Sequence, residues 1–276
     1  MSWLDGPQRK LSRADEHLRE LETQMRRRLD VKKRTVIQQA QTKFTPNGGM
    51  ETILGGLRFV QPPNLPPEWA LLIGDFASNA RAALDHLAWR LVEKNQWRAS
   101  RPKTWPRNVW PPDNTDFPIV AYFRNANDKQ RFNAKLSYFR PPHREAIAAA
   151  QPYKRRKLAR AEPLWLLDRI RNTDAHRELH TVLPSLPASA IGDLYRAVPS
   201  PLGGTTFYLP DQLKRALADV AATASPGDIV ELTLKVQATF SPRVTFDQPG
   251  ADFDGQEVLP LLRHCRDEVE RILGLF

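Results

Sequence analysis

Three segments of the chain, residues 7–29, 68–95 and 255–274, carry apolar residues at three- and four-residue intervals with polar residues between them. This spacing places the apolar side chains on one face of an α-helix. We therefore predict three amphipathic helices that bury one stripe each. The residues expected in these stripes are Leu11, Ala14, Leu18, Leu21, Met25 and Leu29, then Trp69, Leu72, Ile73, Phe76, Ala80, Ala83, Leu84, Leu87 and Leu91, then Val258, Leu261, Leu262, Cys265, Val269 and Ile272.

Shorter periodic segments complete the expected secondary structure. Helical spacing also predicts helices at about 126–138, 142–151, 161–179 and 211–222. Alternating or β-branched runs bounded by Pro and Gly predict strands at about 33–42, 51–60, 190–198, 205–209 and 229–240.

These elements predict an α+β protein, a helical bundle with an antiparallel β-sheet packed on or beside it. We expect one domain spanning residues 1–276, because a chain of this length can fold around a single hydrophobic core. Its helical core would be formed by about 7–30, 68–95, 126–180 and 255–274. The β-rich parts would be about 31–60 and 184–254.

Composition narrows the class of protein. Hydrophobic residues make up 41% of the chain, which excludes a wholly disordered protein. The only cysteine, Cys265, lies on an apolar helix face, so we interpret it as a buried side chain in a protein of a reducing compartment. No apolar run is long enough to span a membrane, and the charged N-terminus is unlike a signal peptide. We expect a cytoplasmic protein with no membrane partner.

The formal charge of +10 favours an anionic partner such as a nucleic acid. Five of the basic residues gather just before the expected helix at 161–179. We take them as the candidate nucleic-acid-binding residues: Lys154, Arg155, Arg156, Lys157 and Arg160. Two further basic clusters lie at 26–34 and 97–107, and the second interleaves arginines with tryptophans. The signatures of nucleotide cofactors, hydrolases and metal sites are missing, so we expect no cofactor and no metal.

Two strings combine arginine with histidine on expected helices. In NARAALDHLAW, residues 79–89, Arg81 precedes His86 by five positions, and Asp85 is placed to pair with Arg81 one turn away. In RNTDAHRELH, residues 171–180, Arg171 precedes His176 by the same interval, with Asn172 directly after the arginine.

The string RNTDAH resembles the Arg-Asn-x-x-x-His motif of the HEPN superfamily of helical-bundle proteins. The two strings together are also similar to NLRSALDHL-like and NIDKHR-like strings of a large group of uncharacterised bacterial and phage proteins. That second resemblance covers most of the chain, including the FPI string at 117–119 and the QPY string at 151–153. The HEPN resemblance is confined to six residues.

The HEPN resemblance implies metal-independent cleavage of RNA, of the toxin or phage-defence type, by a homodimer. Carried over by position, His176 would be the general acid or base, Arg171 the phosphate clamp and Asn172 the polar residue that orients them. A helix places Asn172 and His176 on one face, with Asp168 one turn earlier. Arg81, Asp85 and His86 would form a second motif that pairs with the first inside one chain.

Two alternatives remain open at this point. The Arg, Asp and His residues of both strings are equally consistent with a structural role. They would then form polar contacts that fix how the helices pack, in a non-catalytic interaction protein. A nucleic-acid-binding module without catalysis is the third interpretation.

Overall fold

The computed structural model describes residues 3–30, 32–44, 50–59, 64–94, 115–176, 182–185, 196–199, 205–208, 215, 218–219, 222–223, 225, 227–240 and 242–276. The chain divides into two compact units. Unit 1 comprises residues 1–24, 65–183 and 244–276, and unit 2 comprises residues 25–64 and 184–243.

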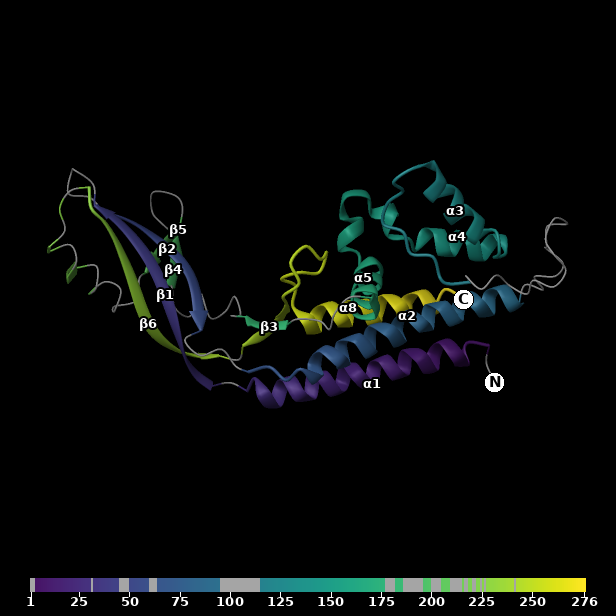
Figure 1. The fold of residues 1–276 in the computed structure, drawn as a ribbon, viewed down its shortest axis with the longest axis horizontal. Helices are drawn as coiled ribbons and strands as arrows, with labels where there is room; N and C mark the ends of the chain where they lie inside the picture. The colour runs from purple at the N-terminus through teal and green to yellow at the C-terminus, as the bar shows by residue number, and fades with distance from the viewer. Residues whose placement is uncertain are drawn as a thin grey trace. The chain divides into compact units, whose positions relative to one another are not determined.

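The chain is rich in helix, and this coarse part of the expected fold class is confirmed (Figure 1). The predicted helices form within a few residues of their expected ends. They are α1 (Asp5–Arg28), α2 (Glu68–Lys94), α3 (Ala126–Leu136), α4 (Pro141–Ala149), α5 (Pro163–His176) and α8 (Val258–Leu273). A 3₁₀ segment that was not predicted, η2 (Pro152–Ala161), lies between α4 and α5 in the chain. Within the described ranges, no helix combines the length and the apolar character that a membrane crossing needs.

The core of unit 1 is built from the predicted apolar stripes. Every predicted stripe residue of α2 except Leu72 is buried, and so are those of α8. Polar contacts at the edges of the stripes fix α1 against its neighbours. Arg266 of α8 pairs with Asp15 at 3.0 Å, and the Trp69 indole N–H donates to Gln24 Oε1 at 3.0 Å.

Cys265 belongs to this core, as its position on the helix predicts. The side chain has no exposed surface, and its Sγ lies 3.3 Å from the Pro163 carbonyl oxygen. Burial raises the pKa of the thiol well above its usual range, because the thiolate would lose its hydration. We expect no reaction with Ellman's reagent at pH 8 in the native protein and one thiol per chain after denaturation. Rapid labelling of the folded protein would contradict this placement.

Helix α5 packs against both α2 and α8. Where α5 meets α2, the carboxylate of Asp174 lies directly over the backbone of Gly74, in the space that a Cβ atom would occupy. A side chain at position 74 would force Asp174 to move. Glycine at this position therefore permits the close approach of the half of α5 that carries the RNTDAH string.

The strands of unit 2 pair with one another. Strands β2 (Met50–Phe59), β1 (Lys32–Phe44) and β6 (Ile229–Phe240) are hydrogen-bonded in that order, and both pairings are antiparallel. The pairing of β1 with β2 has an irregularity between Gln38 and Ala40. A further pair in this unit is formed by β4 (Arg196–Pro199) with β5 (Thr205–Tyr208). Strand β3 (Val182–Ser185) pairs with β7 (Arg243–Phe246), of which residues 244–246 belong to unit 1.

The expectation of one domain stays a prediction. Within the chain, two compact units are distinguished. Strand β1 pairs with β2 on one side and, on the other, with β6, which is almost 200 positions away in the sequence. All three strands belong to unit 2. The expected β-rich range 184–254 contains β4, β5, β6 and β7. The helix predicted at 211–222 lies largely outside the described residues.

Candidate functional site

Arg81 of α2 is the centre of a polar network inside unit 1. Its side chain is only 10% exposed and contacts three carboxylates: Asp85 at 3.2 Å, Asp116 at 3.5 Å and Asp168 at 3.8 Å. Its Nη2 also donates to the Phe117 carbonyl oxygen at 2.8 Å. Arg81 therefore joins α2, α5 and the segment that begins at Asp116. We call this set of residues the Arg81 network.

The network extends in two directions from Arg81. On one side, Lys135 of α3 donates to Asp116 at 2.5 Å. On the other side, the Asn172 side-chain amide donates to Asp168 at 2.9 Å, and Arg171 donates to the Asn172 Oδ1 at 3.0 Å. Side chains from both arginine–histidine strings are thus connected through Asp168.

Burial changes the acidity of two carboxyl groups in the network. It raises the pKa of Asp85 and of Asp168 above their usual range, against the opposing attraction of the Arg81 guanidinium. For Asp85, the backbone N–H of Phe117, which donates to Oδ1 at 3.0 Å, also opposes this rise in pKa. Burial therefore disfavours the charged form of both carboxyl groups.

The raised pKa of Asp168 predicts a pH effect on stability. The native state binds this proton at a higher pH than the unfolded chain, whose Asp titrates near pH 4 (about 3.9). The contribution of Asp168 to the free energy of unfolding should therefore increase as pH falls through the raised pKa toward about 4. Denaturant titrations should show wild type gaining stability relative to Asp168→Asn in this range. A relative loss for wild type would contradict the direction of the shift.

The structure brings together some residues of the two strings and separates others. Arg171 and Asn172 are half-buried beside the Arg81 network. His176 is the last residue of α5, and its side chain lies outside the described part of the structure. His86 is exposed and faces α1, because a Cβ atom on Gly6 would lie 3.5 Å from its Nδ1. Arg81 and Asp85 of the expected second motif thus join the network, whereas His86 points to another neighbour.

Gln151 holds the segment that lines the site. Its side chain is 1% exposed and makes three hydrogen bonds. The Val120 N–H donates to its Oε1 at 3.0 Å, and its Nε2 donates to the carbonyl oxygens of Pro118 and Ile147 at 2.8 and 3.1 Å. One side chain therefore connects the segment after Asp116 to α4. The FPI and QPY strings meet at this point.

Replacing Gln151 with leucine should destabilise unit 1 by about 2–4 kcal/mol, because buried backbone groups would lose their partners. Chemical denaturation followed by circular dichroism measures this loss. Gln8→Leu, at an exposed position of α1, is the matched control and should change stability by less than about 0.5 kcal/mol. Equal stability of the two variants would show that the hydrogen bonds of Gln151 contribute little.

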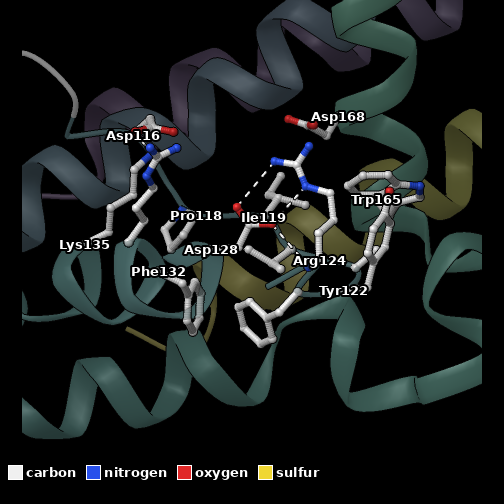
Figure 2. A pocket seen from close by; sticks show the side chains of 14 residues that line it. Asp116, Pro118, Ile119, Tyr122, Arg124, Asp128, Phe132, Lys135, Trp165 and Asp168 are labelled. Carbon is white, nitrogen blue, oxygen red and sulfur yellow. Dashed lines mark hydrogen bonds and ion pairs between the residues drawn. The ribbon is translucent and has the colours of Figure 1, made fainter. Parts of the chain in front are cut away.

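A cavity of about 450 Å³ opens beside the network, between residues 116–124, α3 and α5 (Figure 2). Figure 2 shows Tyr122 and Trp165 together at one side of it and the Arg124 side chain reaching toward Asp128. Asp116 and Asp168 of the network form part of its wall. The lining residues are Asp116, Pro118, Ile119, Val120, Ala121, Tyr122, Phe123, Arg124, Asp128, Arg131, Phe132, Lys135, Trp165 and Asp168.

The candidate nucleic-acid-binding residues do not form one uniform patch. Lys154 and Arg155 line a second cavity, and Arg155 lies 3.6 Å from Glu162. Glu162 therefore offsets the charge of Arg155. The other residues that line this cavity are Glu145, Ala148, Ala149, Ala150, Gln151, Glu162, Glu268 and Arg271.

The remaining three residues of the cluster are exposed. Arg156 and Lys157 make no ion pair with any described residue. Arg160 lies 4.0 Å from Asp252, and its guanidinium carbon is 4.9 Å from the centre of the Tyr122 ring. Arg160 therefore stands at the edge of the first cavity.

The basic cluster and the RNTDAH string lie at opposite ends of α5. The cluster precedes Pro163, while His176 ends the helix, about 20 Å away at 1.5 Å per residue. The cavity with Trp165 and Asp168 lies between them. The basic cluster at 97–107 lies outside the described residues.

The sequence pointed to Arg81, Asp85, Asp168, Arg171 and Asn172, and the structure joins them. No sequence pattern gave a reason to select Asp116 or Lys135, or the residues Tyr122 and Trp165 of the cavity wall. The one available signal was the FPI string directly after Asp116. In the part of the chain that the structure covers, no three His, Cys, Asp or Glu residues are arranged to hold a metal ion.

Comparisons of this chain with family models, with curated proteins and with solved structures find no match.

Proposed function

We propose that this protein acts on RNA, as a metal-independent endoribonuclease whose site is the C-terminal half of α5 with Arg171, Asn172 and His176. The observation that carries the proposal is the hydrogen-bond chain from Asp168 to Asn172 to Arg171. This chain holds the arginine and the asparagine of the RNTDAH string in one arrangement. Such preorganisation is what stabilisation of a developing charge requires.

The arginine is suited to a phosphate. Only one of its N–H groups is used within the described residues, in the bond to Asn172, and no carboxylate lies within 4.0 Å of it there. The guanidinium keeps further donors for the oxygen atoms of a phosphodiester.

The chemistry that fits these residues is attack of a ribose 2′-oxygen on the adjacent phosphorus. The bond from phosphorus to the 5′-oxygen breaks, and the leaving oxygen takes up a proton. His176 would move a proton in this reaction, since imidazole titrates near neutral pH. Arg171 would stabilise the negative charge on the phosphate oxygens. In the HEPN-like arrangement that we propose, two chains form a homodimer with their sites facing one another.

A mixed pool of structured RNA in EDTA tests the proposal. We expect wild type to produce fragments with 2′,3′-cyclic phosphate and 5′-hydroxyl ends, and His176→Ala to leave the RNA intact. Circular dichroism of both proteins controls for folding. Cleavage that persists in His176→Ala would contradict the assignment of the site.

A second candidate function is favoured by the Arg81 network itself. Arg81 forms ion pairs with three carboxylates, and these ion pairs hold α2, α5 and the Asp116 segment together. A protein whose polar residues act only in this way would be a non-catalytic interaction protein. A stable, folded wild type that cleaves no RNA in the same assay would favour this function.

A further inference from the structure

The cavity beside the network has aromatic walls. Phe123 and Phe132 line it with their ring centres 5.6 Å apart, and both contact the Tyr153 ring. Tyr122 and Trp165 meet edge to face at 6.3 Å, and Tyr122 is 46% exposed. The volume of about 450 Å³ is in the range of small-molecule sites. A planar ring can therefore fit in the cavity and stack on its aromatic side chains.

Some backbone groups in the same wall have no hydrogen-bond partner among the described residues. The hydrogen bonds of Phe117 go to Asp85 and Arg81, and those of Val120 go to Gln151 and Tyr153. Ile119 and Ala121, which also line the cavity, make no hydrogen bond through N–H or C=O with any described residue. Each of them offers one donor and one acceptor. A nucleobase edge carries the same two kinds of group.

Cations lie beside the aromatic side chains of the cavity. Arg131 of α3 is exposed, and neither it nor Arg169 of α5 forms an ion pair with a described residue. The Arg169 guanidinium carbon lies 5.7 Å from the centre of the Trp165 ring, and Arg160 covers Tyr122. Cations next to stacking surfaces are the combination that single-stranded nucleic acid binds.

We propose that this cavity binds one base of a single-stranded RNA, with the ring against Tyr122 and Trp165 and the flanking phosphates at Arg131 and Arg169. The base edge would bond to the backbone N–H and C=O groups of Ile119 and Ala121. The inference rests on the proposed action on RNA and adds where the strand is held.

The position of the cavity relates it to the cleavage site. Asp168 lines the cavity and accepts a hydrogen bond from Asn172. Trp165 precedes Asn172 by seven residues, which is about 10 Å along α5. The bound base would therefore belong to a nucleotide one or two positions from the phosphate at Arg171. The strand would run along α5, from Arg160 past Trp165 to the end of the helix.

The test uses a 12-nucleotide RNA with a single 2-aminopurine and the full-length protein in the His176→Ala background, in which we expect no cleavage. Anisotropy of a labelled copy gives the affinity, and quenching of 2-aminopurine reports stacking. Tyr122→Ala, Trp165→Leu and Arg131→Ala should each weaken binding about tenfold. The two aromatic variants should also lose the quenching.

Two matched controls are available in unit 1. Trp89→Leu removes an exposed tryptophan of α2, and Lys129→Ala removes an exposed cation of α3 that does not line the cavity. Both should bind within about twofold of the parent. Tyr122→Ala removes an exposed side chain, so it remains informative if Trp165→Leu fails to fold.

The outcomes separate this inference from the proposed function. Binding that depends on the cavity, in a wild type that does not cleave, would support the base site and contradict the endoribonuclease. Cleavage by wild type with unchanged affinity in all three cavity variants would overturn the base site alone. Absence of RNA binding by folded protein would overturn it as well, in favour of another ligand, such as an extended peptide that bonds to Ile119 and Ala121.

Discussion

Replacing Arg81 with methionine is expected to lower the free energy of unfolding by about 3 kcal/mol. The substitution keeps the aliphatic volume but leaves Asp85, Asp116 and Asp168 without their shared cation. Loss of one partner of a buried ion pair costs about 3–5 kcal/mol. We expect the lower end because the side chains of Asp85 and Asp116 are 34% and 39% exposed, so water screens part of the charge.

Equilibrium denaturation in guanidinium measures this effect. Arg13→Met is the matched control, because Arg13 pairs with Glu16 on the surface of α1 with 59% of its side chain exposed. Such pairs contribute less than about 1 kcal/mol. If Arg81→Met were as stable as Arg13→Met, Arg81 would not hold the three segments together. Adding Asp168→Asn to Arg81→Met should restore part of the stability, because it removes the most buried of the unpaired charges.

Replacing Arg171 with alanine is expected to reduce RNA cleavage by about 10²–10³-fold. That is the usual effect of removing one donor that stabilises charge in the transition state. The fall should appear in kcat rather than in KM, because the interaction strengthens as the phosphate gains charge. Arg171→Lys should recover only part of the rate, since an ammonium cannot donate two parallel hydrogen bonds to a phosphate.

The controls for Arg171 separate a chemical role from a structural one. Arg140→Ala removes an exposed cation at the start of α4 and should keep the wild-type rate. Thermal unfolding of Arg171→Ala should stay close to wild type, since its one described bond is to the adjacent Asn172. A rate loss matched by a loss of folded protein would assign Arg171 to packing instead.

The helices were predictable because their signal is local. An apolar residue every three or four positions determines which face of α1, α2 and α8 is buried, whatever the partner. The same is true of the polar pairs within one helix. Arg81 with Asp85, and Asp168 with Asn172, are neighbours one turn apart, and both pairs form contacts in the structure.

The assembly of the site was not predictable, because it depends on segments that are distant in the sequence. Asp116 reaches Arg81 across 35 positions, and Lys135 reaches Asp116 from α3. No periodic pattern marks such contacts. His86 illustrates the opposite case, since its spacing from Arg81 matches that of His176 from Arg171, yet it faces Gly6 of α1. Its spacing from Arg81 therefore does not bring His86 into the network.

The most direct test of the central claim compares two histidine variants, His176→Ala and His86→Ala, with wild type on structured RNA in EDTA. The RNTDAH string on α5 carries the proposed site, and His86 lies apart from it. We therefore predict that cleavage is lost in His176→Ala and kept in His86→Ala, with all three proteins folded by circular dichroism. Loss of cleavage in both variants, or in His86→Ala alone, would contradict the assignment of the site to α5.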